Sequence, residues 1–459
     1  MLEYLGPYIE DRIRRKGGDR TSTSQFLNTK LVQHYLVKYR RLRLKQALSF
    51  TYEHSRFYHD TMKKHHVHPN DIKTFDDVSK IPLTSSKDLH ESEPFFAVPP
   101  EQFIKVFSSS GTTGPPKRVY FTQKDLQRQI SSITIGLRMM YRLTEKDVAR
   151  ITYDHGYGID DWGVRYCMGR ATESVGAMTV FTGTRLPAQQ ELQALQTYKA
   201  TVLMGTPSYL NSLTHEVQKE IDPKTLSIKT MLVGTEPLPK SMRKNLESTW
   251  NTKVFQGYGL TEMGTSVAGE CQQQDGMHVT ESDFLVEVID PKTEELLEPG
   301  EEGELVFTTL SREGMPFLRY RTRDLGVILK EPCPCGLPFK RIKIKGRTDA
   351  MITIGSGDNI YPEAFNKVLF KLPYVIEFQL VLTKKENKDV VTVVIETNKA
   401  TPQNKKEVLN QLNLLPEIDN GLNDSKTIHS VEVKFVKPNT IKRTGVKAKR
   451  IIDNRHLYE

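Results

Sequence analysis

A short loop rich in hydroxyl and glycine residues carries the clearest chemical pattern in the chain. Its members are Ser109, Ser110, Gly111, Thr112, Thr113 and Gly114, and Lys117 follows after two prolines. Glycine lacks the Cβ atom that keeps a backbone away from a phosphate, while hydroxyl and N–H groups donate to phosphate oxygens and lysine adds positive charge. Residues 119–121 have strand character, whereas a P-loop opens a helix directly after its lysine. The pattern predicts a phosphate site of another kind; a flexible surface loop is the alternative.

Three cysteines and a histidine form a second group of chemical interest. Cys271 and His278 are separated by six residues, and Cys333 and Cys335 flank one proline. Three thiolates and one imidazole are enough for tetrahedral structural zinc. The spacing differs from the common zinc-finger forms, so reduced cysteines beside a surface histidine are the alternative. The chain has too few cysteines for a disulfide-stapled protein.

Repeated strand–loop–helix units must position these residues. Strand-like runs at 104–107, 201–204, 230–233 and 253–256 each lead into a glycine-containing loop. Thr122 and Asp125 have the spacing of a capping box, which predicts a helix start after the phosphate loop. Such units indicate an α/β fold with helix-covered β-sheets, in which ligands bind beyond the carboxyl ends of the strands.

The length of 459 residues exceeds what one hydrophobic core usually supports, so we expect more than one domain. The first hundred residues read as helical. Strand-like runs at 375–383, 390–396 and 431–436, with a helical run at 405–414, indicate a smaller α+β unit near the C-terminus. We therefore predict a large domain at 1–346 and a small C-terminal domain at 347–459.

The charge and hydropathy patterns narrow the partners. The formal net charge is +9, but the basic residues are dispersed among 56 acidic ones, and no nucleic-acid-binding module is recognisable. No stretch approaches the roughly 18 to 20 apolar residues that span a bilayer, and the N-terminus lacks the apolar region of a signal peptide. We expect a cytoplasmic protein without a nucleic-acid or membrane partner.

Further motifs follow the phosphate loop in a fixed order. They are Tyr-Gly-Leu-Thr-Glu-Met-Gly at 258–264, Arg-Thr-Arg-Asp at 321–324, Gly-Arg-Thr-Asp at 346–349 and Gly-Val-Lys-Ala-Lys-Arg at 445–450. Together with the loop they resemble the adenylate-forming superfamily of acyl-CoA synthetases, adenylation domains and luciferases. The chain is most similar to phenylacetate–CoA ligases, coenzyme F390 synthetases and capsule-locus homologues, from about residue 57 to residue 455.

The resemblance implies a role for each motif residue. Lys447 would bridge the substrate carboxylate and the α-phosphate of ATP, Thr261 would donate to that phosphate, and Glu262 would hold Mg²⁺. The remaining nucleotide-binding residues would be Gly234, Glu236, Tyr258 and Gly259 around the adenine, Asp324 at the ribose, and Arg347. Asp349 would be the hinge of the small domain, a mobile lid at 347–459, and the large domain at 1–346 would bind ATP and the acyl group. The acyl pocket would be formed by Tyr153, His155, Tyr157, Gly158, Thr206 and Pro207.

The implied activity has two half-reactions. A carboxylic acid, aromatic or short because the pocket combines aromatic and small residues, would be activated as its acyl-AMP with release of pyrophosphate and then transferred to the thiol of coenzyme A. One alternative is loading of a carrier-protein phosphopantetheine, and another is transfer of AMP to a coenzyme. A nucleotide-binding protein without catalysis is disfavoured because Lys447 and Glu262 are both present. A homodimer is an open alternative for the assembly.

Overall fold

The structure is a computed structural model, and it describes residues 30–108, 117–153, 156–157, 160–161, 163–182, 186–348, 352–354, 358–386, 388–441, 443–444 and 447–455. The chain forms two compact units. Unit 1 comprises Met1–Phe181 and Phe255–Lys345, and unit 2 comprises Thr182–Val254 and Gly346–Glu459. The domain division at residue 346 stays a prediction.

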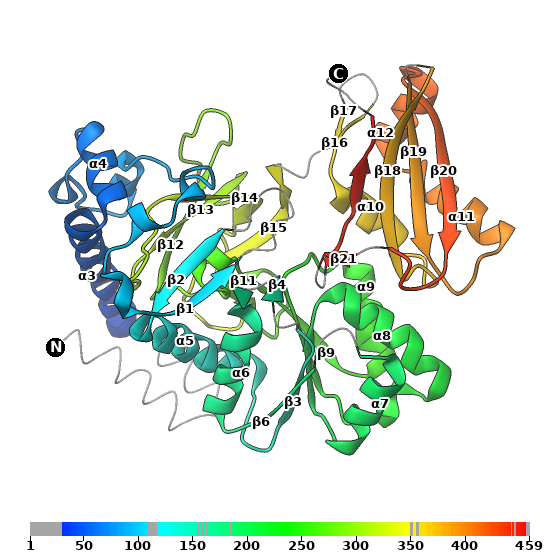
Figure 1. The fold of residues 1–459 in the computed structure, drawn as a ribbon, viewed down its shortest axis with the longest axis horizontal. Helices are drawn as coiled ribbons and strands as arrows, with labels where there is room; N and C mark the ends of the chain where they lie inside the picture. The colour runs from blue at the N-terminus through cyan, green and yellow to red at the C-terminus, as the bar shows by residue number, and fades with distance from the viewer. Residues whose placement is uncertain are drawn as a thin grey trace. The chain divides into compact units, whose positions relative to one another are not determined.

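Unit 1 combines helices with β-sheet (Figure 1). Its helices are α3 (Lys30–His54), α4 (Arg56–Lys64), α5 (Gln123–Tyr141) and α6 (Gly163–Val175), with short 3₁₀ turns η1 (Pro69–Asp71), η2 (Asp76–Lys80), η3 (Asp88–His90), η4 (Glu93–Phe95), η5 (Pro100–Gln102) and η7 (Thr261–Met263). Its strands are β1 (Phe103–Ser108), β2 (Arg118–Thr122), β3 (Val148–Ile151), β4 (Gly156–Tyr157), β5 (Asp160–Asp161), β6 (Met178–Phe181), β9 (Lys253–Tyr258), β10 (Ala268–Glu270), β11 (Met277–Val279), β12 (Phe284–Ile289), β13 (Glu302–Thr309), β14 (Tyr320–Ile328) and β15 (Arg341–Arg347).

The sheet of unit 1 that matters for the site runs in the order β12-β13-β14-β15-β11-β10-β9. Strand β12 of this sheet is buried along its whole length and therefore on both faces. Such strands form from near-continuous apolar runs. A second, four-stranded sheet has the order β2-β1-β5-β4. The first sheet brings the end of β9, the start of β14 and the β10–β11 hairpin into one unit, although they are far apart in the sequence.

Unit 2 contains two sets of elements on one apolar core. The first set is α7 (Ala188–Thr197), β7 (Val202–Gly205), α8 (Pro207–Glu220), η6 (Pro223–Thr225), β8 (Thr230–Val233) and α9 (Lys240–Trp250). The second set is β16 (Ile352–Ile354), β17 (Asp358–Ile360), α10 (Pro362–Leu369), β18 (Glu377–Lys385), β19 (Lys388–Glu396), α11 (Pro402–Leu412), α12 (Pro416–Asp419), the π-helical turn η9 (Asn420–Asp424), β20 (Ile428–Val436), β21 (Arg443–Thr444), β22 (Lys447–Ala448) and β23 (Ile451–Asp453).

Parallel pairing of β7 with β8 and the adjacent helices α7, α8 and α9 give the first set its α/β character (Figure 1). The second set has its own sheet, in the order β20-β19-β18-β23. Leu210 and Trp250 from the first set and Phe365 and Phe378 from the second belong to one buried core. Asn211 also donates from its side-chain amide to the carbonyl of Ile376 at 2.9 Å. Burial of such large apolar side chains is the main force that holds these segments together.

Several predicted elements are confirmed. The strand predicted at 230–233 is β8, and those at 104–107, 201–204 and 253–256 are β1, β7 and β9 with ends shifted by one or two residues. Helix α5 begins after a capping box, in which the hydroxyl of Thr122 accepts from the backbone of Asp125 at 3.1 Å and the Asp125 carboxylate accepts from the backbone of Thr122 at 3.2 Å. The predicted fold class is confirmed: an α/β protein with a smaller C-terminal α+β part that has a separate sheet.

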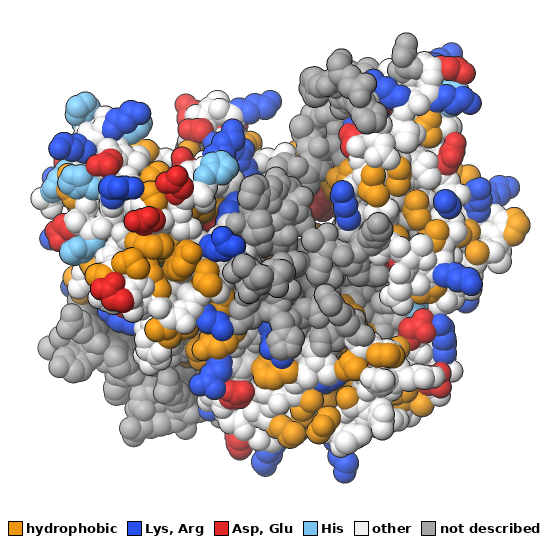
Figure 2. Space-filling model, viewed as in Figure 1, with side chains coloured by type: hydrophobic (Ala, Val, Ile, Leu, Met, Phe, Trp, Pro, Cys, Tyr) orange, Lys and Arg blue, Asp and Glu red, His pale blue; other side chains and the backbone are white. Residues whose placement is uncertain are grey.

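On the face drawn in Figure 2, Lys and Arg side chains are interspersed with Asp, Glu and apolar side chains. Among the helices that the structure describes, none is both long and apolar enough to cross a bilayer.

Candidate active site and metal centre

Glu262 sits in a tight turn that the local sequence requires. Strand β9 ends at Tyr258, and the turn η7 that follows is closed by a hydrogen bond of 3.0 Å from the N–H of Gly264 to the carbonyl of Thr261. Gly264 has a φ of +90°, a conformation that favours glycine. At Gly259 a Cβ atom would lie 1.6 Å from the carbonyl oxygen of Thr265, so only glycine fits. The glycines of this motif therefore shape the loop that carries Glu262.

The carboxylate of Glu262 is buried, with 6% of the residue exposed, yet it is well supplied with donors. Its Oε1 atom accepts from Lys117 Nζ at 3.0 Å and from the Tyr320 hydroxyl at 2.7 Å. Burial raises the pKa of this carboxyl, but the charge of Lys117 and the hydrogen bond from Tyr320 outweigh burial and lower it. Glu262 is therefore ionised, and its oxygens suit a hard cation such as Mg²⁺.

Arg312 supports the same turn from the loop between β13 and β14. Its guanidinium is buried and donates to the backbone carbonyl of Glu262. It also lies over the ring of Phe121 at 4.8 Å and that of Phe317 at 5.8 Å. Burial lowers its pKa to about 10, while nearby carboxylates act in the opposite direction, so the group remains a cation at neutral pH.

Sequence reasoning missed both Arg312 and Tyr320. Tyr320 directly precedes the 321–324 motif, and that position is the only trace of its role in the sequence. Arg312 belongs to no motif. Both reach Glu262 across 50 or more residues of chain, a proximity that only the tertiary fold creates.

Tyr258 and Asp324 meet across the same sheet. The hydroxyl of Tyr258, at the end of β9, donates to Oδ2 of Asp324 in β14 at 2.6 Å. Asp324 is 7% exposed, and its backbone N–H donates to the hydroxyl of Thr322 at 3.0 Å. The structure thus brings together two residues that the sequence assigned to the nucleoside, with the tyrosine orienting the carboxylate.

Four of the predicted residues of unit 2 lie just beyond the carboxyl ends of β7 and β8. Thr206 is the N-cap of α8, where its hydroxyl accepts from the backbone of Tyr209 at 3.3 Å, and Pro207 is the first helical residue. The Glu236 carboxylate accepts from the backbone of Ser208 at 3.2 Å, a favourable place for an anion at a helix N-terminus. Gly234 directly follows β8, and its N–H donates to Gly205 at 3.4 Å.

The other predicted residues are located less fully. Tyr153 is buried in unit 1, with 3% exposed, and Arg347 ends β15. Tyr157 belongs to β4 and Lys447 to β22, but the side chains of both lie outside the described part of the structure. The residues that lie wholly outside the described ranges are Ser109, Ser110, Gly111, Thr112, Thr113, Gly114, His155, Gly158 and Asp349.

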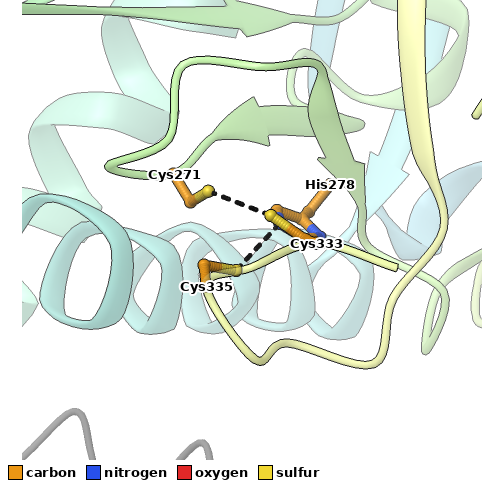
Figure 3. A group of neighbouring side chains, drawn as sticks. All are labelled: Cys271, His278, Cys333 and Cys335. Carbon is orange, nitrogen blue, oxygen red and sulfur yellow. Dashed lines mark hydrogen bonds between the residues drawn. The ribbon is translucent and has the colours of Figure 1, made fainter. Parts of the chain in front are cut away.

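The cysteines and the histidine form a compact group in unit 1 (Figure 3). Cys271 directly follows β10 and His278 lies in β11, which pairs with β10 in an antiparallel hairpin, whereas Cys333 and Cys335 come from the segment between β14 and β15. All four ligand atoms lie within 4.8 Å of one another. The Sγ atoms of Cys271 and Cys333 are 3.6 Å apart, and Cys335 Sγ is 3.3 Å from His278 Nε2.

This geometry fits tetrahedral zinc. Metal–sulfur bonds of about 2.3 Å place tetrahedral ligand sulfurs about 3.8 Å apart, close to the 3.6 Å between the Sγ atoms of Cys271 and Cys333. His278 Nδ1 lies 3.2 Å from the carbonyl of Phe339, an outer partner that would leave Nε2 for a metal. Hydrogen bonds from Cys335 and His278 lower the pKa of the Cys271 thiol, which favours the thiolate form that binds metals. The four residues are therefore suited to hold a structural zinc ion.

Comparison with known families agrees with this site. The model of the family described as "AMP-binding enzyme" matches residues 48–311, and that of the "AMP-binding enzyme C-terminal domain" matches residues 357–455. The first match covers more than half of the chain and contains Lys117, Tyr258 and Glu262. These matches define the class of the protein as that of the AMP-binding enzymes.

Similarity to individual proteins shows to which branch of the AMP-binding enzymes the chain belongs. Phenylacetate–coenzyme A ligases from Aromatoleum evansii and Escherichia coli (strain K12) are 34% and 31% identical to the chain, over 90% of the chain and over 93% and 94% of those enzymes. A crystal structure of 2-hydroxyisobutyryl-CoA ligase with 2-HIB-AMP has a TM-score of 0.79 at 22% identity and covers 93% of this chain and 90% of that one, which supports the shared fold. The chain belongs to the phenylacetate–CoA ligase branch of the adenylate-forming superfamily and is an AMP-forming acid–thiol ligase, as its motifs predicted.

Proposed function

We propose that this enzyme activates a small carboxylic acid, aromatic or short-chain, as its acyl-AMP and then transfers the acyl group to coenzyme A. In the first step a carboxylate oxygen bonds to the α-phosphorus of ATP while the bond to the bridging oxygen breaks, and pyrophosphate leaves. In the second step the thiol sulfur bonds to the acyl carbon, AMP leaves with the electron pair, and the thiol proton is released. The relatives named above support both steps.

The observation that carries the proposal is the buried, ionised Glu262 beside Lys117. A carboxylate and a triphosphate repel each other, so the adenylation step needs cations and fixed donors. Glu262 would hold Mg²⁺, which supplies charge neutralisation at the phosphates. Lys117 and the loop from Ser109 to Gly114 would bind phosphate oxygens, and Thr261 would donate to the α-phosphate. Asp324, oriented by Tyr258, would accept from the ribose hydroxyls.

The remaining assignments rest on sequence motifs. Lys447 would neutralise the reacting carboxylate and α-phosphate, with Asp349 as the hinge of the C-terminal domain. Tyr153, with the aromatic and small residues predicted beside it, would favour a compact acid. Cys271, His278, Cys333 and Cys335 would hold structural zinc.

A substrate panel tests the proposal. AMP release is measured with phenylacetate, benzoate, 2-hydroxyisobutyrate and acetate, each with coenzyme A or with a phosphopantetheine-loaded carrier protein. We expect at least one acid to give AMP and an acyl-CoA in equal amounts. AMP release that depends on the carrier protein alone would replace coenzyme A as the acceptor, and absence of acid-dependent AMP release would refute the proposal.

A further inference from the structure

Tyr320 stands out among the residues around Glu262 because it is fixed. It is the first residue of β14 and is 2% exposed. Its ring packs edge-on against Phe317, with centroids 5.4 Å apart, and its hydroxyl ends 2.7 Å from Oε1 of Glu262. A tyrosine with two side-chain torsions in such packing holds its hydroxyl in one place.

Lys117 differs from Tyr320 in this respect. Its side chain is 30% exposed, whereas that of Glu262 is 7% exposed. Lysine is a strongly hydrated point charge on a flexible four-carbon stem. Tyr320 and Lys117 therefore donate to the same atom, Oε1 of Glu262. The tyrosine is buried and rigid, whereas the lysine side chain can move towards solvent or towards a ligand.

The backbone of Glu262 has its own anchor in the Arg312 guanidinium, which donates to the Glu262 carbonyl. Glu262 is thus held at its main chain by Arg312 and at its carboxylate by Tyr320. Lys117 supplies the positive charge that a buried carboxylate requires. Both side-chain hydrogen bonds are accepted by Oε1 of Glu262.

We propose that Tyr320 is a positioning residue of the reaction, which holds the Glu262 carboxylate in place while its counter-ion changes from Lys117 in the nucleotide-free protein to Mg²⁺ in the nucleotide complex. The inference rests on the proposed function, because it takes Glu262 as the metal ligand. A rigid neutral donor keeps the carboxylate aligned during the exchange, and release of Lys117 frees a cation for a phosphate. Loss of a partner that orients a metal ligand typically lowers metal affinity or activity by about 10- to 100-fold.

The test compares Tyr320→Phe with Tyr58→Phe in pyrophosphate exchange at varied Mg²⁺. Tyr58 is a matched control because it is a buried tyrosine of the same unit whose hydroxyl bonds to Thr84 at 3.1 Å and to the N–H of Leu318 at 2.9 Å. For Tyr320→Phe we expect the half-saturating Mg²⁺ concentration to rise about tenfold, with kcat at saturating Mg²⁺ close to that of the wild type. Tyr58→Phe should lower the thermal midpoint and leave the Mg²⁺ requirement unchanged.

The outcomes separate the inference from the function. Without exchange in the wild type, the proposed function itself fails, and the inference with it. If the wild type exchanges pyrophosphate and Tyr320→Phe has the Mg²⁺ requirement of Tyr58→Phe, or loses kcat that Mg²⁺ does not restore, Tyr320 is not a positioning residue.

A second variant tests the counter-ion exchange without touching the buried tyrosine. Lys117→Met removes a partly exposed side chain, and Lys124→Met, which removes an exposed lysine paired with Glu313 at 2.5 Å, is its control. Mn²⁺ binding to the nucleotide-free proteins is followed by electron paramagnetic resonance. We expect Lys117→Met to bind Mn²⁺ about tenfold more tightly than the wild type, because the competing cation is gone. Equal Mn²⁺ binding by the two lysine variants would overturn the exchange.

Discussion

Replacement of Tyr258 by phenylalanine isolates the hydroxyl that orients Asp324. The variant keeps the ring and removes one hydrogen bond of 2.6 Å to a carboxylate that is 7% exposed. A hydrogen bond to a charged group contributes about 1.5 to 3 kcal/mol. If Asp324 receives the ribose as proposed, the lower end of this range corresponds to about a tenfold loss in apparent ATP affinity. We therefore expect the KM for ATP to rise about tenfold, with kcat changed by no more than about threefold.

Steady-state AMP release at varied ATP and saturating acid measures this effect. Tyr120→Phe is the control, because its ring packs against Phe96 and Phe103 in the same unit. A KM for ATP that is unchanged in Tyr258→Phe, with a normal thermal midpoint, would contradict the assignment of the pair to the nucleotide. An equal rise in both variants would show a general packing effect.

Four further changes have defined outcomes. Lys447→Ala should reduce acid adenylation at least about 100-fold more than thiolation of preformed acyl-AMP, and equal losses would contradict its role. Gly259→Ala places a Cβ atom 1.6 Å from a backbone carbonyl oxygen and should abolish pyrophosphate exchange; wild-type exchange would refute the turn geometry. Burial acts to raise the pKa of Asp283, but the charge of Arg128 outweighs burial and lowers it below the value of about 4 expected in the unfolded chain. The ionised carboxylate therefore stabilises the fold above about pH 4, and this stabilisation is lost as the pH falls further. The thermal midpoint of Asp283→Asn should therefore fall less between pH 6 and pH 3.5 than that of the wild type, and equal falls would exclude the linkage. We expect elemental analysis to find zinc in the wild type but not in Cys333→Ser, which should also melt several degrees lower; a metal-free wild type would remove the zinc proposal.

Local patterns predicted a large part of the fold. The capping box of Thr122 and Asp125 defines the start of α5 because its two hydrogen bonds form between residues three apart. The run at 230–233 became β8 because an apolar stretch bounded by turn residues has few other conformations to adopt. The shared core of Leu210, Trp250 and Phe378 could not be predicted in this way. It depends on segments more than a hundred residues apart.

The residues of the site likewise differ in whether the sequence predicted them. Glu262 and Asp324 lie in recognisable motifs, since their loops and strand ends have compositional constraints such as the glycine at 259. Arg312 and Tyr320 had no comparable pattern, because their role is defined by contacts with Glu262 that arise only after the sheet has formed. The cysteine–histidine group was visible as a set of ligand types. The proximity of its four ligand atoms became visible only when β10, β11 and the segment before β15 were placed together.

Acid-dependent exchange of radiolabelled pyrophosphate into ATP, without any thiol acceptor, tests the central claim most directly. This exchange requires that an acyl-AMP forms reversibly on the enzyme and that pyrophosphate attacks it. We predict exchange that depends on both a carboxylic acid and Mg²⁺, and that falls at least about 100-fold in Glu262→Gln. Absence of exchange with every acid of the panel, or full exchange in Glu262→Gln, would contradict the account.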